Sequence, residues 1–89
     1  MPTLSIPQPY RGPTRGEATV AVSGHTVREC IEDADTRYPG MRDQVLDVRG
    51  ELHRFVRLFR NGELLQARPL DDVVEAEDEI AILAAIAGG

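Results

Sequence analysis

Only one stretch of this 89-residue chain repeats apolar residues at the spacing of a full-length helix. Those residues recur every three or four positions and form one stripe: Val27, Cys30, Ile31, Ala34 and Tyr38. Thr26 and Glu29 have the spacing of a capping box at the start of this helix, and Pro39-Gly40 ends it. A chain of this length buries about 60% of its unfolded surface, enough for one modest core. The rest of that core must come from strands.

The stretches on either side of the helix alternate polar and apolar residues over short runs, as strands do. The expected strands cover residues 3–6, 17–22, 54–60, 63–66 and 79–83. Asn61-Gly62 lies between two of them and is a strong hairpin signal, because both positions of a type I′ turn need positive φ. Residues 41–53 fit either a short helical turn, carrying Met41, Val45, Leu46 and Val48, or a loop.

This order of elements predicts an α+β fold. A single helix covers only one face of a sheet, so the other face meets water or a partner. We expect the first and last strands to be parallel neighbours at the centre. The result is a ubiquitin-like β-grasp arrangement, with a mixed sheet of four to five strands packed on one main helix. Residues 1–83 would form this domain, and residues 84–89 a flexible tail ending in Gly88-Gly89.

The strand expected at residues 54–60 carries a candidate docking surface. Val56 and Leu58 should face the helix, which leaves Phe55, Arg57 and Phe59 on the opposite face. Either residues 41–53 cover one or both phenylalanines, or these side chains form an exposed aromatic and arginine patch. Residues of these types are enriched at the centres of protein interfaces.

Residues 71–79 carry six carboxylates in a chain of net charge −5. The run is typical of a solvated loop; as a functional element it would steer a basic partner toward the nearby tail. It has no histidine or cysteine and does not match a calcium loop, so we expect no metal site. The acidic balance also argues against nucleic acid as a partner.

Nothing in the chain resembles a catalytic centre, and we expect no catalytic residue and no bound cofactor. Cys30 lies on the apolar stripe, where a cysteine acts as a small buried hydrophobe, and His25 and His53 have no evident partners. A single cysteine permits no internal disulfide, and the apolar run at residues 80–87 is far shorter than the roughly 20 residues of a membrane span. We therefore expect a cytoplasmic protein without a membrane partner.

The end of the chain is the remaining candidate. Residues 84–89 contain no side chain that could carry chemistry, so the reactive group there is the α-carboxylate of Gly89. Six residues beyond Leu83 reach about 20 Å when extended, and glycine allows a close approach to a partner's backbone. All ten basic residues are arginine, so the chain offers no lysine side chain for conjugation to itself.

A Gly-Gly end after the last strand of a β-grasp pattern resembles the sulfur-carrier family. Ala85-Ile86-Ala87-Gly88-Gly89, Leu52-His53-Arg54-Phe55-Val56 and the Asn61-Gly62 hairpin carry the resemblance. The family includes the thiamine-pathway carrier, the small subunit of molybdopterin synthase and carriers of cysteine biosynthesis. The length and the 41–53 insertion look most like the actinobacterial cysteine-pathway carriers. Relatives often have proline just before the tail, where this chain has Ala84-Ala85.

The resemblance implies a mechanism in which Gly89 is the site of adenylation and thiocarboxylate formation. A ubiquitin-activating-type adenylyltransferase and sulfurtransferase would use ATP to activate the carboxylate, while Ala85, Ile86, Ala87 and Gly88 thread into the partner. A sulfur-accepting biosynthetic enzyme, cysteine-synthase-like or of another pathway, would receive the sulfur. The resemblance also implies a partner of another kind, a metal-dependent protease that removes the carrier from its conjugates. The alternatives are a molybdopterin synthase small subunit and a ubiquitin-like protein modifier.

Overall fold

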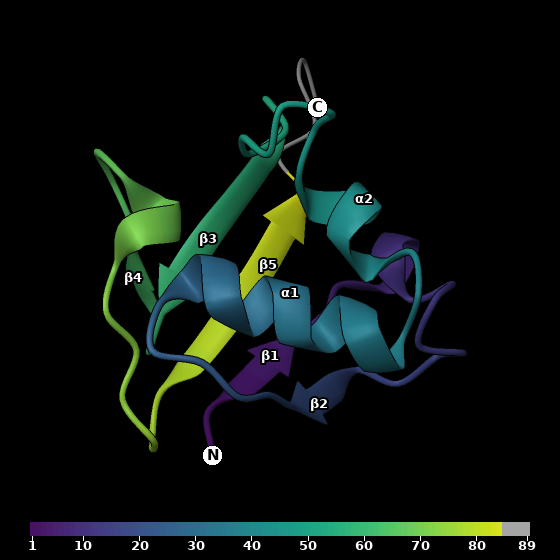
Figure 1. Cartoon of the computed structure of the whole chain (residues 1–89), viewed down its shortest axis with the longest axis horizontal. Helices are drawn as coiled ribbons and strands as arrows, with labels where there is room; N and C mark the ends of the chain where they lie inside the picture. Colours follow the sequence, from purple (N-terminus) through teal and green to yellow (C-terminus); the bar gives the residue numbers. More distant parts are fainter. Residues whose placement is uncertain (85–89) are drawn as a thin grey trace.

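In the computed structural model, which describes residues 1–84, helix α1 (Val27–Arg37) lies across one face of a five-stranded sheet (Figure 1). The strands are β1 (Thr3–Ser5), β2 (Thr19–Ala21), β3 (Val56–Arg60), β4 (Glu63–Leu64) and β5 (Glu79–Ala84). Their order across the sheet is β2-β1-β5-β3-β4. β1 and β5 are parallel, and every other neighbouring pair is antiparallel. The predicted β-grasp arrangement, with its first and last strands side by side, is confirmed.

The start of α1 follows from local hydrogen bonds. The Thr26 hydroxyl oxygen accepts from the Glu29 amide at 3.2 Å, and the Glu29 carboxylate accepts in return from the His25 amide at 2.7 Å. The helix ends before Tyr38, and Gly40 then adopts the left-handed conformation with φ 106°. Both ends lie where the sequence places them.

Residues 41–53 form a short helix and a closed turn. Helix α2 (Met41–Val45) adds Met41 and Val45 to the core, and Leu46 follows them there. Leu46 then pairs with Leu52 in an isolated antiparallel bridge. The side chain of Val48, at the tip of this turn, is fully exposed. The segment therefore covers one end of the core rather than the outer face of the sheet.

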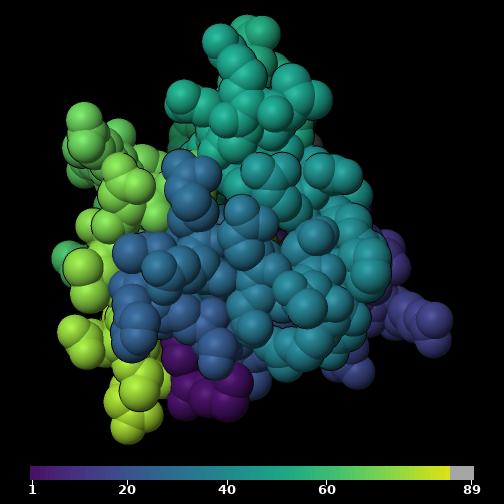
Figure 2. Space-filling model, in the orientation of Figure 1, coloured from purple at the N-terminus to yellow at the C-terminus, as the bar shows by residue number. Residues whose placement is uncertain are grey.

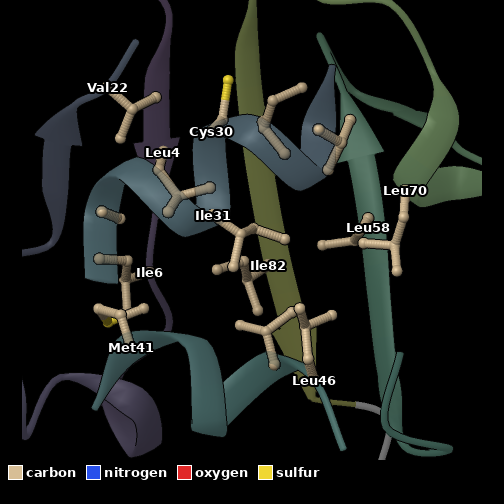
Figure 3. Packing of buried hydrophobic residues seen from close by; sticks show 14 of the residues in the cluster. Leu4, Ile6, Val22, Cys30, Ile31, Met41, Leu46, Leu58, Leu70 and Ile82 are labelled. Atoms are coloured by element: carbon tan, nitrogen blue, oxygen red, sulfur yellow. The ribbon is translucent and has the colours of Figure 1, made fainter. Parts of the chain in front are cut away.

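The core lies between the sheet and the two helices (Figure 3). Ile31 of α1 lies over Ile82 of β5, while Leu4 and Leu58 project from the strands on either side. Val56 and Leu58 are buried as predicted, because alternate residues of β3 point toward the helix. Cys30 is buried in the same layer.

Several strands differ from the prediction at their ends. β1 stops at Ser5, two residues before Pro7, which has no amide hydrogen to continue the ladder. β3 begins at Val56, because the Val56 amide donates to the His53 carbonyl at 3.0 Å and closes a turn over the residues before it. β5 runs one residue further than expected, to Ala84, which pairs with Val56. Short 3-10 helices, η1 (Gln8–Tyr10) and η2 (Pro69–Asp71), complete the connections.

The Thr26 cap can be tested by replacing Thr26 with alanine. We expect T26A to lower the free energy of unfolding by about 1 kcal/mol, because the Glu29 amide loses its acceptor. In a domain of this size that loss lowers the melting temperature by about 4–8 °C, measurable by circular dichroism. T36A is the matched control, since Thr36 is exposed within the same helix and alanine is the better helix former. Equal melting temperatures for T26A and T36A would contradict the role of Thr26 as the N-terminal cap of α1.

Candidate functional site

The residues expected to carry the chemistry lie outside the described part of the chain. These are Ala85, Ile86, Ala87, Gly88 and the adenylation site Gly89. The structure describes the chain up to Ala84, at the end of β5. The candidate site is therefore defined here by the end of β5 and by the surface around it.

The end of β5 is held by one neighbour. β3 pairs with β5 through to Ala84, opposite Val56. On the other side, the β1 pairing ends at Ser5 and Ala81. Among the described residues, the last three residues of β5 therefore pair with β3 alone. The described chain ends beside the turn that leads into β3. We call this end of the sheet, where β5 ends and β3 begins, the rim.

The outer face of the sheet, opposite α1, carries an apolar stripe bordered by an arginine. Arg57 lies opposite Leu83, and Phe59 lies between Ala81 and Leu64. Leu64 and Leu83 expose 44% and 46% of their surface, while Phe59 is half-buried and Arg57 exposed. We call the set of Arg57, Phe59, Leu64 and Leu83 the outer patch. Residues 41–53 do not cover it, because they pack at the end of the core.

Phe55 is exposed but lies outside β3. It sits in the turn closed between His53 and Val56, so the alternation of the strand does not extend to it. Phe55 is 47% exposed, and the Arg54 guanidinium lies over its ring, 5.1 Å from the ring centroid. Sequence alternation groups Phe55 with Arg57 and Phe59, whereas the structure places Phe55 within the turn before β3.

The outer patch includes two residues that the sequence did not single out. Leu83 faces outward because its neighbour Ile82 is buried, an alternation already present in the sequence. Its position opposite Arg57 depends on the register of β3 against β5. Leu64 joins through the hairpin, which sets it opposite Phe59.

The acidic run lies at the opposite end of β5 from Ala84. It leads into Glu79, the first residue of the strand, and six residues of strand span about 17–20 Å. Figure 1 shows this connection at one end of the β5 arrow and the segment between α2 and β3 at the other. The length of β5 therefore separates the run from Ala84, while the tail that the run was expected to lie near falls outside the described residues.

Three carboxylates of this run have partners, and the longest of these contacts joins Asp71 to Arg68 at 4.0 Å. Asp72 pairs with Arg60 at 3.0 Å. Asp78 accepts from the Glu75 amide and from the Asn61 side chain, each at 2.8 Å. Asn61, at φ 51°, also accepts from the Glu79 amide at 2.9 Å, which ties the hairpin to the start of β5. The Glu75 amide and the Asn61 side chain lower the pKa of Asp78 from 3.8.

The remaining candidate groups take part in structure. Burial, together with the nearby Asp33 and Glu29 carboxylates, raises the pKa of the Cys30 thiol from 9.0 to about 11. At neutral pH this thiol is protonated, as expected of a cysteine in a core. The His53 ring nitrogen Nε2 lies 3.1 Å from the Asp43 carbonyl oxygen. Within residues 1–84, no three histidine, cysteine or acidic side chains gather as a metal site.

No helix within residues 1–84 has both the length and the apolar character needed to cross a bilayer.

Comparison with known proteins identifies relatives over nearly the whole chain. The family model described as "ThiS family" matches residues 7–89. The sulfur carrier protein CysO of Mycobacterium tuberculosis and of Mycobacterium bovis is 36% identical over 98% of this chain and 97% of that protein.

Solved structures agree with this result. A chain in the crystal structure of the Amycolatopsis orientalis BexX/CysO complex has a TM-score of 0.90 and 36% identity, with each chain fully covered. The small archaeal modifier protein 1 of Haloferax volcanii has a TM-score of 0.77 and 25% identity, over 99% of this chain and 98% of that one.

The pKa shift of Asp78 predicts a loss of stability in acid. A carboxyl whose pKa is lower in the folded state stabilises the fold above its unfolded value of 3.8, and this contribution disappears as the pH falls through the folded pKa. We expect the urea midpoint to fall from pH 5 to pH 2.5, and D78N to be less stable at pH 7 but to vary less with acid. E77Q, a neighbouring change outside these hydrogen bonds, should retain the wild-type slope. An unchanged slope in D78N would contradict this role.

Proposed function

Since this chain belongs to the ThiS family, we propose that it is a sulfur carrier protein that works through a thiocarboxylate at Gly89. The observation that supports the proposal is the position of β5. This strand is at the centre of the sheet, and the described chain leaves it at the rim, beside an exposed apolar patch. A partner can hold the domain by its surface while it acts on the end of the chain.

The chemistry needs two steps on the partner. A carboxylate oxygen of Gly89 attacks the α-phosphorus of ATP, and pyrophosphate leaves to give the acyl-adenylate. Hydrosulfide supplied at the partner's active site then attacks the acyl carbon, the bond from that carbon to the phosphate oxygen breaks so that AMP leaves, and the proton of hydrosulfide is lost. The product is a thiocarboxylate whose sulfur a second enzyme accepts. The carrier supplies the carboxylate and the surfaces that partners recognise, and the ATP belongs to the activating enzyme.

The geometry limits where the activating site can lie. Five residues follow Ala84, and an extended chain of that length spans at most about 18 Å. The activating enzyme must therefore bring its nucleotide within that distance of the rim of the sheet. Gly88 and Gly89 have no side chains to clash with a narrow channel. Residues next to the rim, including Arg57 and Leu83, are then the first surface that the enzyme meets.

The sulfur acceptor is proposed to be a biosynthetic enzyme for cysteine or another sulfur-containing metabolite. The support is the CysO relatives, one of which forms a complex with BexX. A protein modifier is the second candidate, supported by the likeness to small archaeal modifier protein 1. Mass spectrometry of cellular proteins separates the two, because conjugation leaves this chain's C-terminal residues on lysines of other proteins.

The thiocarboxylate can be detected directly. The full chain is incubated with a ubiquitin-activating-type enzyme, ATP and sulfide, and its mass is compared before and after. We expect a gain equal to the replacement of one oxygen by sulfur, located in the C-terminal peptide. A variant lacking Gly88-Gly89 should show no gain and an unchanged circular dichroism spectrum, since both residues lie beyond β5. A gain that persists in the shortened chain would exclude Gly89 as the site.

The outer patch can be tested with the same enzyme. We expect L83S and R57Q each to raise the KM for the carrier about tenfold at unchanged kcat, since central interface residues contribute about 1–2 kcal/mol. V73S is the control, because Val73 is 58% exposed but belongs to the acidic connection away from the patch. A KM that rises equally in V73S, or in none of the variants, would show that the activating enzyme does not bind the outer patch.

A further inference from the structure

A hollow of about 550 Å³ opens on the α1 side of the molecule, away from the outer patch. Its walls are the first turn of α1, residues 49–52 of the turn after α2, and residues 67–71 around η2. In Figure 2 these three parts meet as the blue, teal and green surfaces. We call this hollow the arginine notch, because Arg28, Arg49 and Arg68 line it.

The arginine notch gathers positive charge in an acidic chain. Glu51 and Asp71 also line it, but only Arg68 pairs with one of them, at 4.0 Å between two exposed side chains. Within residues 1–84, neither the Arg28 guanidinium nor the Arg49 guanidinium lies within 4.0 Å of a carboxylate oxygen. The Arg49 guanidinium, and the N–H groups of Arg28 that do not donate to the Gly50 carbonyl, are therefore available to an external anion, for which arginine is well suited.

The walls of the notch are fixed before any partner binds. The Arg28 guanidinium donates to the Gly50 carbonyl at 2.7 Å. The Asp47 carboxylate accepts from the Arg49 amide at 2.8 Å and from the Glu51 amide at 3.0 Å. These bonds, with the Leu46–Leu52 bridge, close the turn. A rigid turn loses little conformational entropy on binding.

The same turn presents an apolar side chain that the fold does not use. Val48 is 101% exposed at its tip, next to Arg49. Inside the notch, the half-buried Leu52 and the buried Leu70 provide an apolar floor. A ligand that matches both features carries a carboxylate beside an apolar group.

The location favours a protein over a small molecule. The notch is open, and a single small ligand inside it would leave the outward-pointing Val48 without a contact, whereas a protein surface can cover both. The turn also lies close to the rim, because only residues 53–55 separate Leu52 from Val56, the partner of Ala84. In Figure 1 the arrowhead of β5 points toward this segment. An enzyme that encloses the end of the chain therefore reaches the turn as well.

We propose that the arginine notch binds an acidic segment of the enzyme that activates the tail. A carboxylate of that segment lies between Arg28 and Arg49, and an adjacent apolar side chain packs on Val48 and Leu52. This assignment of the partner rests on the proposed sulfur-carrier function. The binding of a carboxylate by the notch does not depend on that function.

The recognition chemistry is tested on the full chain by NMR. The probe is a capped tetrapeptide of leucine, aspartate, glutamate and leucine, and the control peptide replaces its acids with asparagine and glutamine. We expect the acidic peptide to shift the amide signals of residues 49–52 and 68–71, less so at high salt. R49Q should abolish these shifts, while R15Q, which removes an exposed arginine from another loop, should retain them. Shifts that are absent, spread over the chain or unchanged in R49Q overturn the proposal.

The partner is tested by the kinetics of activation. We expect R49Q and V48S to raise the KM for the carrier about fivefold at unchanged kcat, and R15Q to leave it unchanged. If the wild-type chain gains no sulfur at all, the proposed sulfur-carrier function is wrong. The peptide experiment still shows whether the notch binds an acidic segment. If activation proceeds and R49Q behaves as R15Q does, the activating enzyme is not the partner and the proposal is overturned.

Discussion

The parallel pairing of β1 with β5 is the contact on which the rest of the structure depends. It joins segments from opposite ends of the described chain, and closing so long a loop costs conformational entropy. Burial of Leu4, Ile80 and Ile82 beneath α1 offsets that cost. Once β5 is central, β3 must pair on its other side. β1 stops before Pro7, so the end of β5 extends past it to the rim of the sheet.

A single main helix has a direct consequence for function. It covers one face of the sheet and leaves the other to partners. Phe59 and Leu83 are therefore exposed or half-exposed because no second layer packs on them, although their neighbours Leu58 and Ile82 are fully buried. The stability of the domain and its recognition surface thus use alternate residues of the same strands. Substitutions on the outer patch can change recognition with little effect on the core.

The distribution of charge explains how an acidic chain can present basic surfaces. Carboxylates of the acidic connection have partners within the domain, because Asp72 forms an ion pair with Arg60 and Asp78 accepts a hydrogen bond from Asn61 in the hairpin. These groups lie at the start of β5. The arginine notch includes Arg28 and Arg49, whose guanidinium groups form no ion pair with a carboxylate of residues 1–84. A partner close to the surface responds to this local charge more than to the net charge, because salt screens over about 8–10 Å.

Local patterns in the sequence determined the elements: the capped helix, the Asn61-Gly62 hairpin and the inward alternation of Val56 and Leu58. They also placed Arg57 and Phe59 on the outer face, because side-chain direction within one strand has a fixed period of two. The tertiary structure alone decided which other residues lie beside Arg57 and Phe59. Leu83 meets Arg57 through a register between strands far apart in the chain, and the acidic run lies away from the rim because β5 separates them. Neither relation is encoded in local periodicity, since both arise from which distant segments pair.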